Sequence, residues 1–229
     1  MATALQTMTN ELTHVFLLSV GAFLLAMFLT PIYTFFAYRY RFWKRQRSES
    51  TDGKKLKIFA KFQAAKLQRN IPTMAGVIGV IAIFIVTFFC NLDRAQTWLP
   101  LAALLGGGAV GLIDDIINIR GTGGGAACLR SPVKFALITL IGAVLGWFFF
   151  AKLGLMSFHV PFMGDVSIGW LIIPLFAFAV VATGNAVNIS DGMDGLAGGL
   201  LSASFGAFGV IALLQQQVLL AGFCFTVVG

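Results

Sequence analysis

Long apolar stretches constrain this chain more than any other feature of its sequence. Hydrophobic residues make up 58% of the 229 residues and charged residues only 11%, and the mean hydropathy is +0.89. Several stretches approach or exceed the roughly 20 residues that cross a bilayer as a helix. They lack the polar face that a helix on a soluble core would carry. The chain is therefore predicted to be an all-α polytopic membrane protein.

The apolar stretches predict about six complete transmembrane helices and a seventh that begins near Val218 and is cut off at Gly229. The expected spans are 14–38, 73–91, 97–113, 132–151, 168–187 and 196–214. We expect a single integral membrane domain over 1–229. The first apolar segment is too long for the core of a signal peptide, so it is expected to remain as an anchor. The segment 152–167 alternates apolar and polar residues and predicts a small hairpin or an interfacial piece.

Lysine and arginine fall almost entirely on one side of the predicted spans. Most of the 16 lie in the basic loop 39–71, and on the opposite side we expect only Arg94 and Lys152. The positive-inside rule therefore puts the N-terminus outside and the basic loop in the cytoplasm. The loop contributes most of the net charge of +7. It fits a topology signal on anionic lipid and also a guide for an anionic substrate. Because this charge adjoins the spans, nucleic-acid binding is not expected.

The adjacent carboxylates of Asp114 and Asp115 follow the apolar run LLGGGAVGLI, where a predicted span meets the cytoplasm. An Asp near the centre of a membrane helix costs about 2.5–3.5 kcal/mol. Two adjacent carboxylates also repel each other unless a cation or hydrogen bonds hold them. Mg²⁺ is one such cation, because it prefers carboxylate and phosphate oxygens. The pair equally fits a solvated marker of a helix end, and its residues alone do not decide.

A second cluster consists of amides and carboxylates that recur every third residue in GNAVNISDGMDGLAGG, namely Asn185, Asn188, Asp191 and Asp194. In the same stretch Gly184, Gly192 and Gly195 predict a broken or tight segment, with a new helix starting near Ser190 or Asp191. Either residue would serve as its N-cap, and a helix N-terminus suits phosphate. Broken backbone at membrane depth occurs inside protein or beside a watery cavity. The alternative is polar contact between helices.

A third motif, IPTMAG, opens the second span on the same side as both acidic clusters. Together GLIDD, NAVNISDGMDGLAGG and IPTMAG resemble the motifs of the polyprenyl-phosphate N-acetylhexosamine-1-phosphate transferases. The NAVN-x-[ST]-DG-x-DGL form favours the branch that acts on UDP-MurNAc-pentapeptide over the branches that act on GlcNAc donors. The resemblance implies Mg²⁺-dependent transfer of phospho-MurNAc-pentapeptide to undecaprenyl phosphate. The products would be lipid I and UMP, made for peptidoglycan at the cytoplasmic face of a bacterial inner membrane.

The resemblance also implies roles for individual residues. It assigns catalytic roles to Asp114, Asp115 and Asp191, with Asp114 deprotonating or orienting the lipid phosphate. It places five further residues along the substrate cleft, namely Thr73, Lys134, Asn188, Met193 and Asp194. Of these, Asn188 would lie near the ribose and diphosphate, Met193 and Asp194 toward the uracil, and Lys134 near the phosphates. A homodimer is implied as well.

The chain departs from the family pattern at several positions. A family lysine upstream of PTM aligns with Gln68, and a lysine often found after the acidic pair aligns with Asn118. The resemblance places a metal-binding Asp and a histidine-rich loop beyond Gly229, so the chain alone is expected to be inactive and its metal ligands are unknown. A similar MGD triplet ends at Asp165, but it lies on the predicted external side and is not taken as that motif.

Three alternatives remain open beside the transferase of this branch. A related GlcNAc-1-phosphate-type transferase would use the same motifs. An ion or metal transporter would use intramembrane carboxylates, although it predicts acids near mid-bilayer and internal repeats. An inactive membrane fragment is the third alternative.

Overall fold

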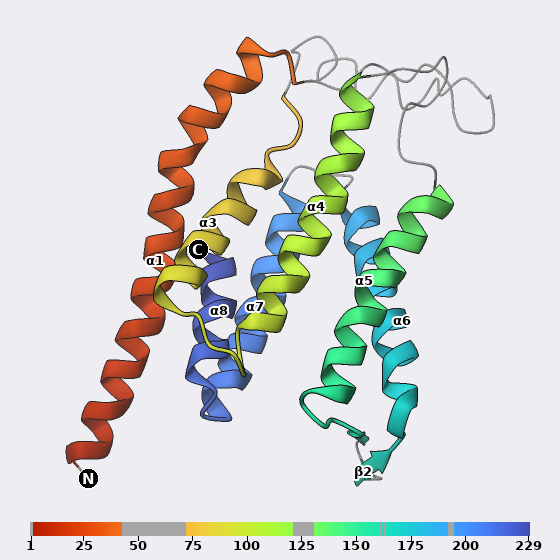
Figure 1. The fold of residues 1–229 in the computed structure, drawn as a ribbon. Helices are drawn as coiled ribbons and strands as arrows, with labels where there is room; N and C mark the ends of the chain where they lie inside the picture. Colours follow the sequence, from red (N-terminus) through yellow and green to blue (C-terminus); the bar gives the residue numbers. More distant parts are fainter. Residues whose placement is uncertain (1, 43–71, 121–130, 161, 163, 192–194) are drawn as a thin grey trace.

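The computed structural model describes residues 2–42, 72–120, 131–160, 162, 164–191 and 195–229. These residues form a bundle of apolar helices with one small hairpin (Figure 1). The helices are α1 (Ala2–Arg39), α3 (Gly76–Cys90), α4 (Trp98–Arg120), α5 (Ser131–Ala151), α6 (Ile172–Ser190), α7 (Leu196–Leu214) and α8 (Val218–Val228). A 3₁₀ turn, η1 (Gly169–Leu171), precedes α6, and the strands are β1 (Ser157–Val160) and β2 (Gly164–Ser167).

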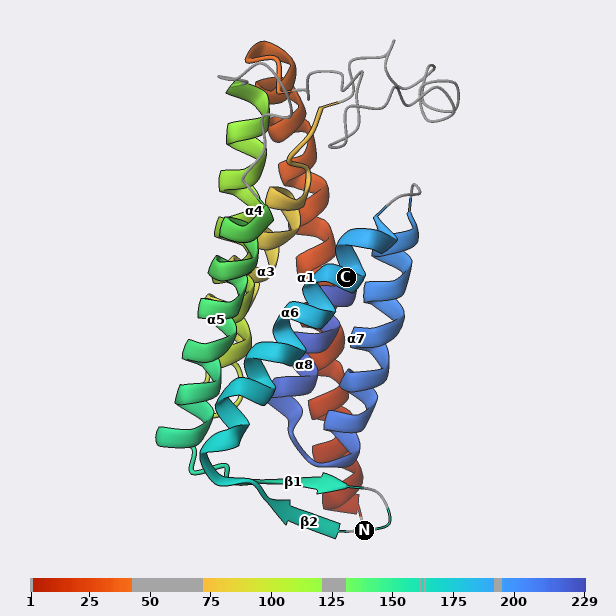
Figure 2. The ribbon, with the colours of Figure 1, turned by 90° about the vertical axis from the view of Figure 1, so that its right-hand side faces the viewer.

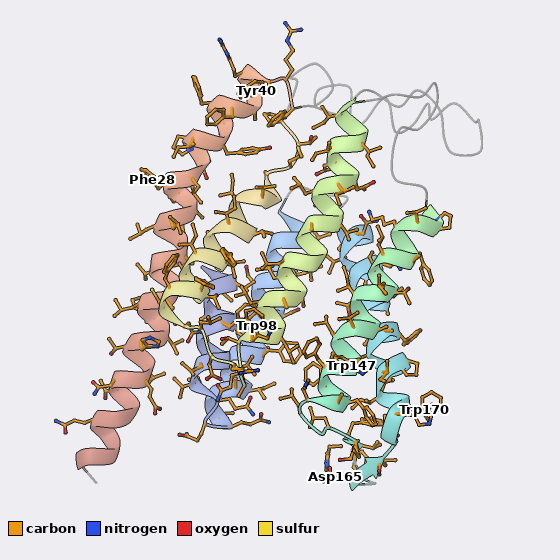
Figure 3. All side chains as sticks on the ribbon, in the orientation of Figure 1. Phe28, Tyr40, Trp98, Trp147, Asp165 and Trp170 are labelled. Carbon is orange, nitrogen blue, oxygen red and sulfur yellow. The ribbon has the colours of Figure 1, made fainter. Side chains whose placement is uncertain are left out.

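The helices confirm the prediction of an all-α polytopic membrane protein. Within the described residues, 5 helices are long and apolar enough to cross a membrane, and α3 and α8 are shorter apolar helices. Large apolar side chains cover the outside of the bundle. On α1, for example, Phe28 points away from the other helices and is 66% exposed (Figure 3). Such a surface is stable against lipid tails and would not be stable in water.

Helices α5 and α6 form the most extensive helix pair in the described part of the chain. Two glycines of α5 allow this close approach. A Cβ atom on Gly142 would lie 2.8 Å from the Cα of Ala177, and one on Gly146 would lie 3.0 Å from the Cα of Ile173. Small residues at helix contacts are the usual route to close packing in membranes. The pair therefore holds its backbones at a separation that larger side chains would not permit.

Helices α1, α3, α7 and α8 form the other part of the bundle. Val15 of α1 packs with Ala212 of α7 and Ala221 of α8, and Leu18 of α1 packs with Val86 of α3. These contacts join segments from both ends of the chain. The N-terminal helix is thereby held against the last two helices, as Figures 1 and 2 show.

Polar side chains fasten the start of α8 to the connection between α3 and α4. The side-chain amide of Asn91 donates to the carbonyl of Leu219 at 2.8 Å. The backbone N–H of Leu220 donates to Oε1 of Gln96 at 3.1 Å. The first N–H groups of a helix have no partner within the helix, so the Gln96 side chain satisfies one of those donors.

All the helix ends that carry the three motifs lie at one end of the bundle (Figure 1). The C-terminal ends of α1, α4 and α6 meet the N-terminal ends of α3, α5 and α7 there. We call this the motif end. The opposite end carries the antiparallel hairpin of β1 and β2 (Figure 2). The hairpin predicted in 152–167 is therefore confirmed, and Asp165 lies at the end away from the motifs (Figure 3).

The second helix of the predicted set begins later than the sequence suggested. The span was expected from residue 73, but α3 begins at Gly76. Met74 has a φ of 73°, a left-handed conformation that a helix cannot contain. The N–H of Thr73 meanwhile donates to the carbonyl of Phe42 at 2.7 Å. This contact ties the residues before Gly76 to Phe42, which lies just after the end of α1.

The predicted helix start near Ser190 or Asp191 is wrong. Helix α6 continues to Ser190, and Asp191 is its C-cap, with its N–H donating to the carbonyl of Val187 at 3.1 Å. The Ser190 hydroxyl donates back to the carbonyl of Ala186 at 2.9 Å, so it does not cap a following helix. Helix α7 begins only after Gly195, whose φ of 79° favours glycine. Asp191 therefore lies at the negative end of a helix dipole.

Candidate functional site

The acidic pair lies within α4 and not at its end. Helix α4 continues beyond Asp115 to Arg120, so the pair does not mark the end of the helix. The side chain of Asp114 is only 17% exposed, and Asp115 is half-buried. Carboxylates in this position need charged or hydrogen-bonding partners, because burial disfavours their ionised form.

Lys134 supplies a cation for the first of these carboxylates. It lies in the first turn of α5, and its ammonium is 3.3 Å from Oδ2 of Asp114. The Lys134 side chain is 33% exposed, so the ion pair is partly open to solvent. Two residues that the sequence assigned to the same site are thereby in direct contact, from two different helices.

Thr73 is linked to the acidic pair through a residue that sequence reasoning missed. The hydroxyl of Tyr33 in α1 donates to the carbonyl of Thr73, and this phenol is close enough to Asp115 to feel the charge of its carboxylate through space. Thr73 is also held by Phe42, whose carbonyl accepts from its N–H at 2.7 Å and its hydroxyl at 3.3 Å. A polar aromatic residue near the motif end of the first apolar stretch was the available signal for Tyr33.

These contacts form one polar layer across the motif end. The layer consists of Tyr33 from α1, Thr73 before α3, Asp114 and Asp115 from α4, and Lys134 from α5. It presents carboxylates, an ammonium and a phenol in the parts of apolar helices near the motif end. Such a set can orient a phosphate group that arrives from the lipid side and can exchange a proton with it.

The second cluster is more open. Asn188 in the last turns of α6 and Asp191 at its C-cap are both exposed. Met193 and Asp194 lie outside the described residues, so their predicted places in the cleft stay predictions. Helix α5 packs on both α4 and α6, which places the two clusters on neighbouring parts of the motif end (Figure 1).

The described carboxylates are too few and too scattered to form a magnesium site of their own. Within the described residues, no group of three or more His, Cys, Asp and Glu side chains is arranged to hold a metal ion. Asp114, one of the two adjacent carboxylates, already has the Lys134 ammonium beside it. This set does not by itself make a Mg²⁺ site, and we derive no chemical step through a metal.

Comparison with known proteins places this site in a family. Residues 97–229 match the model of a family described as glycosyl transferase family 4. The chain is 33% identical over 230 residues to the phospho-N-acetylmuramoyl-pentapeptide-transferase of Chloroflexus aggregans, covering 97% of this chain and 60% of that protein. It is 37% identical over 170 residues to the protein of the same name from Listeria welshimeri, covering 69% of this chain and 50% of that protein.

The chain thus spans about 60% of the length of the Chloroflexus protein. The matched region 97–229 contains α4 to α8 and therefore both acidic clusters and Lys134. It covers more than half of the chain and carries most of the polar layer. On that match, the chain belongs to glycosyl transferase family 4.

Proposed function

We propose that the protein containing this chain transfers phospho-MurNAc-pentapeptide from UDP-MurNAc-pentapeptide to undecaprenyl phosphate, forming lipid I and UMP. The observation that carries the proposal is the polar layer at the motif end, in which Lys134 and Asp114 are 3.3 Å apart. The names of the relatives from Chloroflexus and Listeria support the same reaction. The motif end is where a phosphate on a lipid would meet a soluble nucleotide.

The layer suits phosphoryl transfer because that reaction depends on positioning and charge neutralisation more than on covalent work by the protein. An oxygen of the lipid phosphate attacks the β-phosphorus of the nucleotide sugar, the bond to the α-phosphate oxygen breaks, and UMP leaves. In our proposal Asp114 orients the lipid phosphate or takes its proton, with Asp115 beside it. Lys134 holds the Asp114 carboxylate and faces the phosphates.

The second cluster is proposed to receive the nucleotide sugar. Asn188 and Asp191 are exposed at the end of α6, and amide and carboxylate groups bind ribose hydroxyls through hydrogen bonds. Asp194 and Met193 would then lie toward the uracil. A soluble ligand that must enter and leave suits side chains that the fold leaves accessible.

Side, cofactor and assembly form part of the same proposal. The excess of Lys and Arg in 39–71 supports a cytoplasmic motif end in a multi-pass bacterial membrane protein. We propose Mg²⁺ dependence because two substrates that both carry phosphate need their charge neutralised. A homodimer is proposed from the family resemblance alone. Chelation by EDTA, with recovery on addition of Mg²⁺, tests the cofactor.

The test measures UMP release from UDP-MurNAc-pentapeptide in membranes of cells that express this chain. The expressed protein includes whatever the gene encodes after Gly229. Release is expected only when undecaprenyl phosphate is present. Asp114→Asn and Asp191→Asn are each expected to abolish it. The matched control is Asp165→Asn, the same substitution in the hairpin at the opposite end, which should leave release unchanged. Full turnover in both site variants would refute the assignment.

Two further measurements separate the proposal from its alternatives. UMP release from UDP-GlcNAc, with none from UDP-MurNAc-pentapeptide, would indicate the GlcNAc branch. Metal flux into liposomes without any nucleotide would indicate a transporter. Metal flux is not expected, since the carboxylates lie toward one end of the helices (Figure 1).

A further inference from the structure

The hairpin between α5 and α6 has two chemically different faces. Its register pairs Phe158 with Val166 and His159 with Asp165. Opposed residues in an antiparallel pair lie on the same face, and successive residues alternate between faces. Phe158, Val160 and Val166 therefore form an apolar face, and the other face consists of polar residues only, namely Ser157, His159, Asp165 and Ser167.

The polar face is open to water. Nδ1 of His159 and Oδ1 of Asp165 are 2.9 Å apart, and their side chains are 71% and 74% exposed. The apolar face is less exposed, with Val160 and Val166 half-buried and Phe158 45% exposed. The hairpin thus has the pattern of an amphipathic element at a boundary between water and an apolar medium.

A fully exposed aromatic residue stands where the two strands connect. Phe162 has its whole side chain exposed and a φ of 72°. That conformation is uncommon for a bulky residue, and a fully exposed phenyl ring is unfavourable in water. Both features are explained if the ring enters an apolar environment that the polypeptide itself does not provide.

The surroundings of the hairpin indicate which environment that is. The strands run across the ends of the helices and not along them, so they lie roughly in the plane of a membrane surface (Figure 2). Trp147 of α5 and Trp170 of η1, one on each side of the hairpin in the chain, are exposed near the same end (Figure 3). Tryptophan at this position is typical of the membrane–water interface.

The hairpin also lacks support from protein. Among the described residues, neither strand packs extensively on a helix, and each contacts chiefly the other strand. Its base is closed by the carbonyl of Met156, which accepts from the N–H groups of Ile168 at 2.9 Å and Gly169 at 3.0 Å. An isolated two-stranded hairpin is at best marginally stable in water. An additional apolar contact is therefore needed to hold it.

We propose that the hairpin is a membrane-interface anchor at the end opposite the motifs. The apolar face and Phe162 insert among the headgroups and upper acyl chains of the lipid leaflet, and the His159–Asp165 pair faces water. The anchor fixes the depth of the ends of α5 and α6, the two helices that carry Lys134 and Asp191 at their far ends. This inference is independent of the reaction that the motif end catalyses.

The test compares two tryptophan substitutions in vesicles of phosphatidylethanolamine and phosphatidylglycerol. Phe162→Trp places the reporter at the apolar tip, and Ser167→Trp places it on the polar face of the same hairpin. Both positions are exposed, so neither change removes packing within the protein. The emission of the unsubstituted chain, which has four tryptophans, is subtracted from that of each variant. Quenching by doxyl lipids labelled near the headgroup is compared with quenching by aqueous acrylamide.

The additional emission of Phe162→Trp is expected at a shorter wavelength than that of Ser167→Trp. The doxyl lipid should quench it more strongly than acrylamide does. The additional emission of Ser167→Trp should be quenched mainly by acrylamide. Equal quenching of both reporters by acrylamide would put the tip in water and overturn the proposal. Shielding of Phe162→Trp from both quenchers would also overturn it, because the tip would then be covered by protein and not by lipid.

Discussion

The two acidic clusters share the motif end of the bundle but are held in different ways. The first lies inside a helix, where Asp114 is 17% exposed and paired with Lys134. The second lies at the end of α6, where Asn188 and Asp191 are exposed. One set of charges is arranged by the protein before any ligand arrives. The other is left accessible to whatever binds.

This difference matches the proposed substrates. A phosphate on a membrane lipid moves only in the bilayer plane, so a carboxylate and an ammonium already in place can receive it without rearrangement. A nucleotide sugar enters from water and must leave as UMP, which suits accessible groups. The Lys134–Asp114 pair is partly exposed, and such pairs contribute only about 0–1 kcal/mol to stability. In our proposal the pair therefore matters to the reaction more than to folding.

The largest effects are expected from neutralising one carboxylate in each cluster, and they should show which substrate each cluster binds. Asp114→Asn and Asp191→Asn should both abolish UMP release, but only Asp191→Asn should weaken binding of UDP-MurNAc-pentapeptide. Loss of a charged hydrogen bond costs about 1.5–3 kcal/mol, so the affinity should fall roughly tenfold or more. Isothermal titration in detergent measures it. Equal losses of affinity in the two variants would remove the distinction between the clusters.

Removal of the cation from the first cluster should have the next largest effect. Lys134→Met leaves the Asp114 carboxylate without its ammonium, and UMP release is expected to fall by about 10²-fold, as for loss of one preorganised charge donor. Lys134→Arg keeps the charge but not the shape, and should retain more activity than the Met variant. The thermal unfolding midpoint should change little in either, so a large loss of stability would mean that the pair is structural.

The contact between α5 and α6 connects the two clusters, because α5 carries Lys134 and α6 ends at Asp191. Gly142→Val would place a Cβ 2.8 Å from the Cα of Ala177. Overpacking of this kind costs about 1–3 kcal/mol, and thermal unfolding in detergent should show it. The control is Gly107→Ala in α4, where a Cβ would meet nothing within 4 Å. A Gly142 variant as stable as this control would contradict the described packing.

The smallest effect is expected at the phenol that links Thr73 to the acidic pair. Tyr33→Phe removes the hydroxyl that donates to the Thr73 carbonyl. One hydrogen bond contributes about 0.5–1.5 kcal/mol, so UMP release should fall by no more than roughly tenfold. Tyr38→Phe is the control, since Tyr38 is an exposed residue of the same helix. Equal activity of both variants would show that Tyr33 does not position the site.

Local pattern predicted much of this protein correctly. The apolar runs determined the helices, and the alternation in 152–167 predicted the hairpin. The predictions failed where a distant residue or a backbone conformation decided the outcome. Helix α3 starts at Gly76 because Met74 has a left-handed φ of 73° and Thr73 bonds to Phe42, 31 residues earlier in the chain. Helix α7 starts after Gly195 and not at Ser190, because α6 continues through Ser190 and Gly195 has a left-handed φ of 79°.

The sequence by itself determined that the chain is a helical membrane protein whose motifs meet at one end, because hydropathy and loop charge act residue by residue. It also determined the family, because the NAVNISDGMDGLAGG stretch is specific. Only the tertiary structure decided that Lys134 pairs with Asp114, that Tyr33 joins Thr73 to the layer, and that Asp191 closes a helix. These contacts join helices far apart in the chain, and their geometry depends on how closely the helices pack.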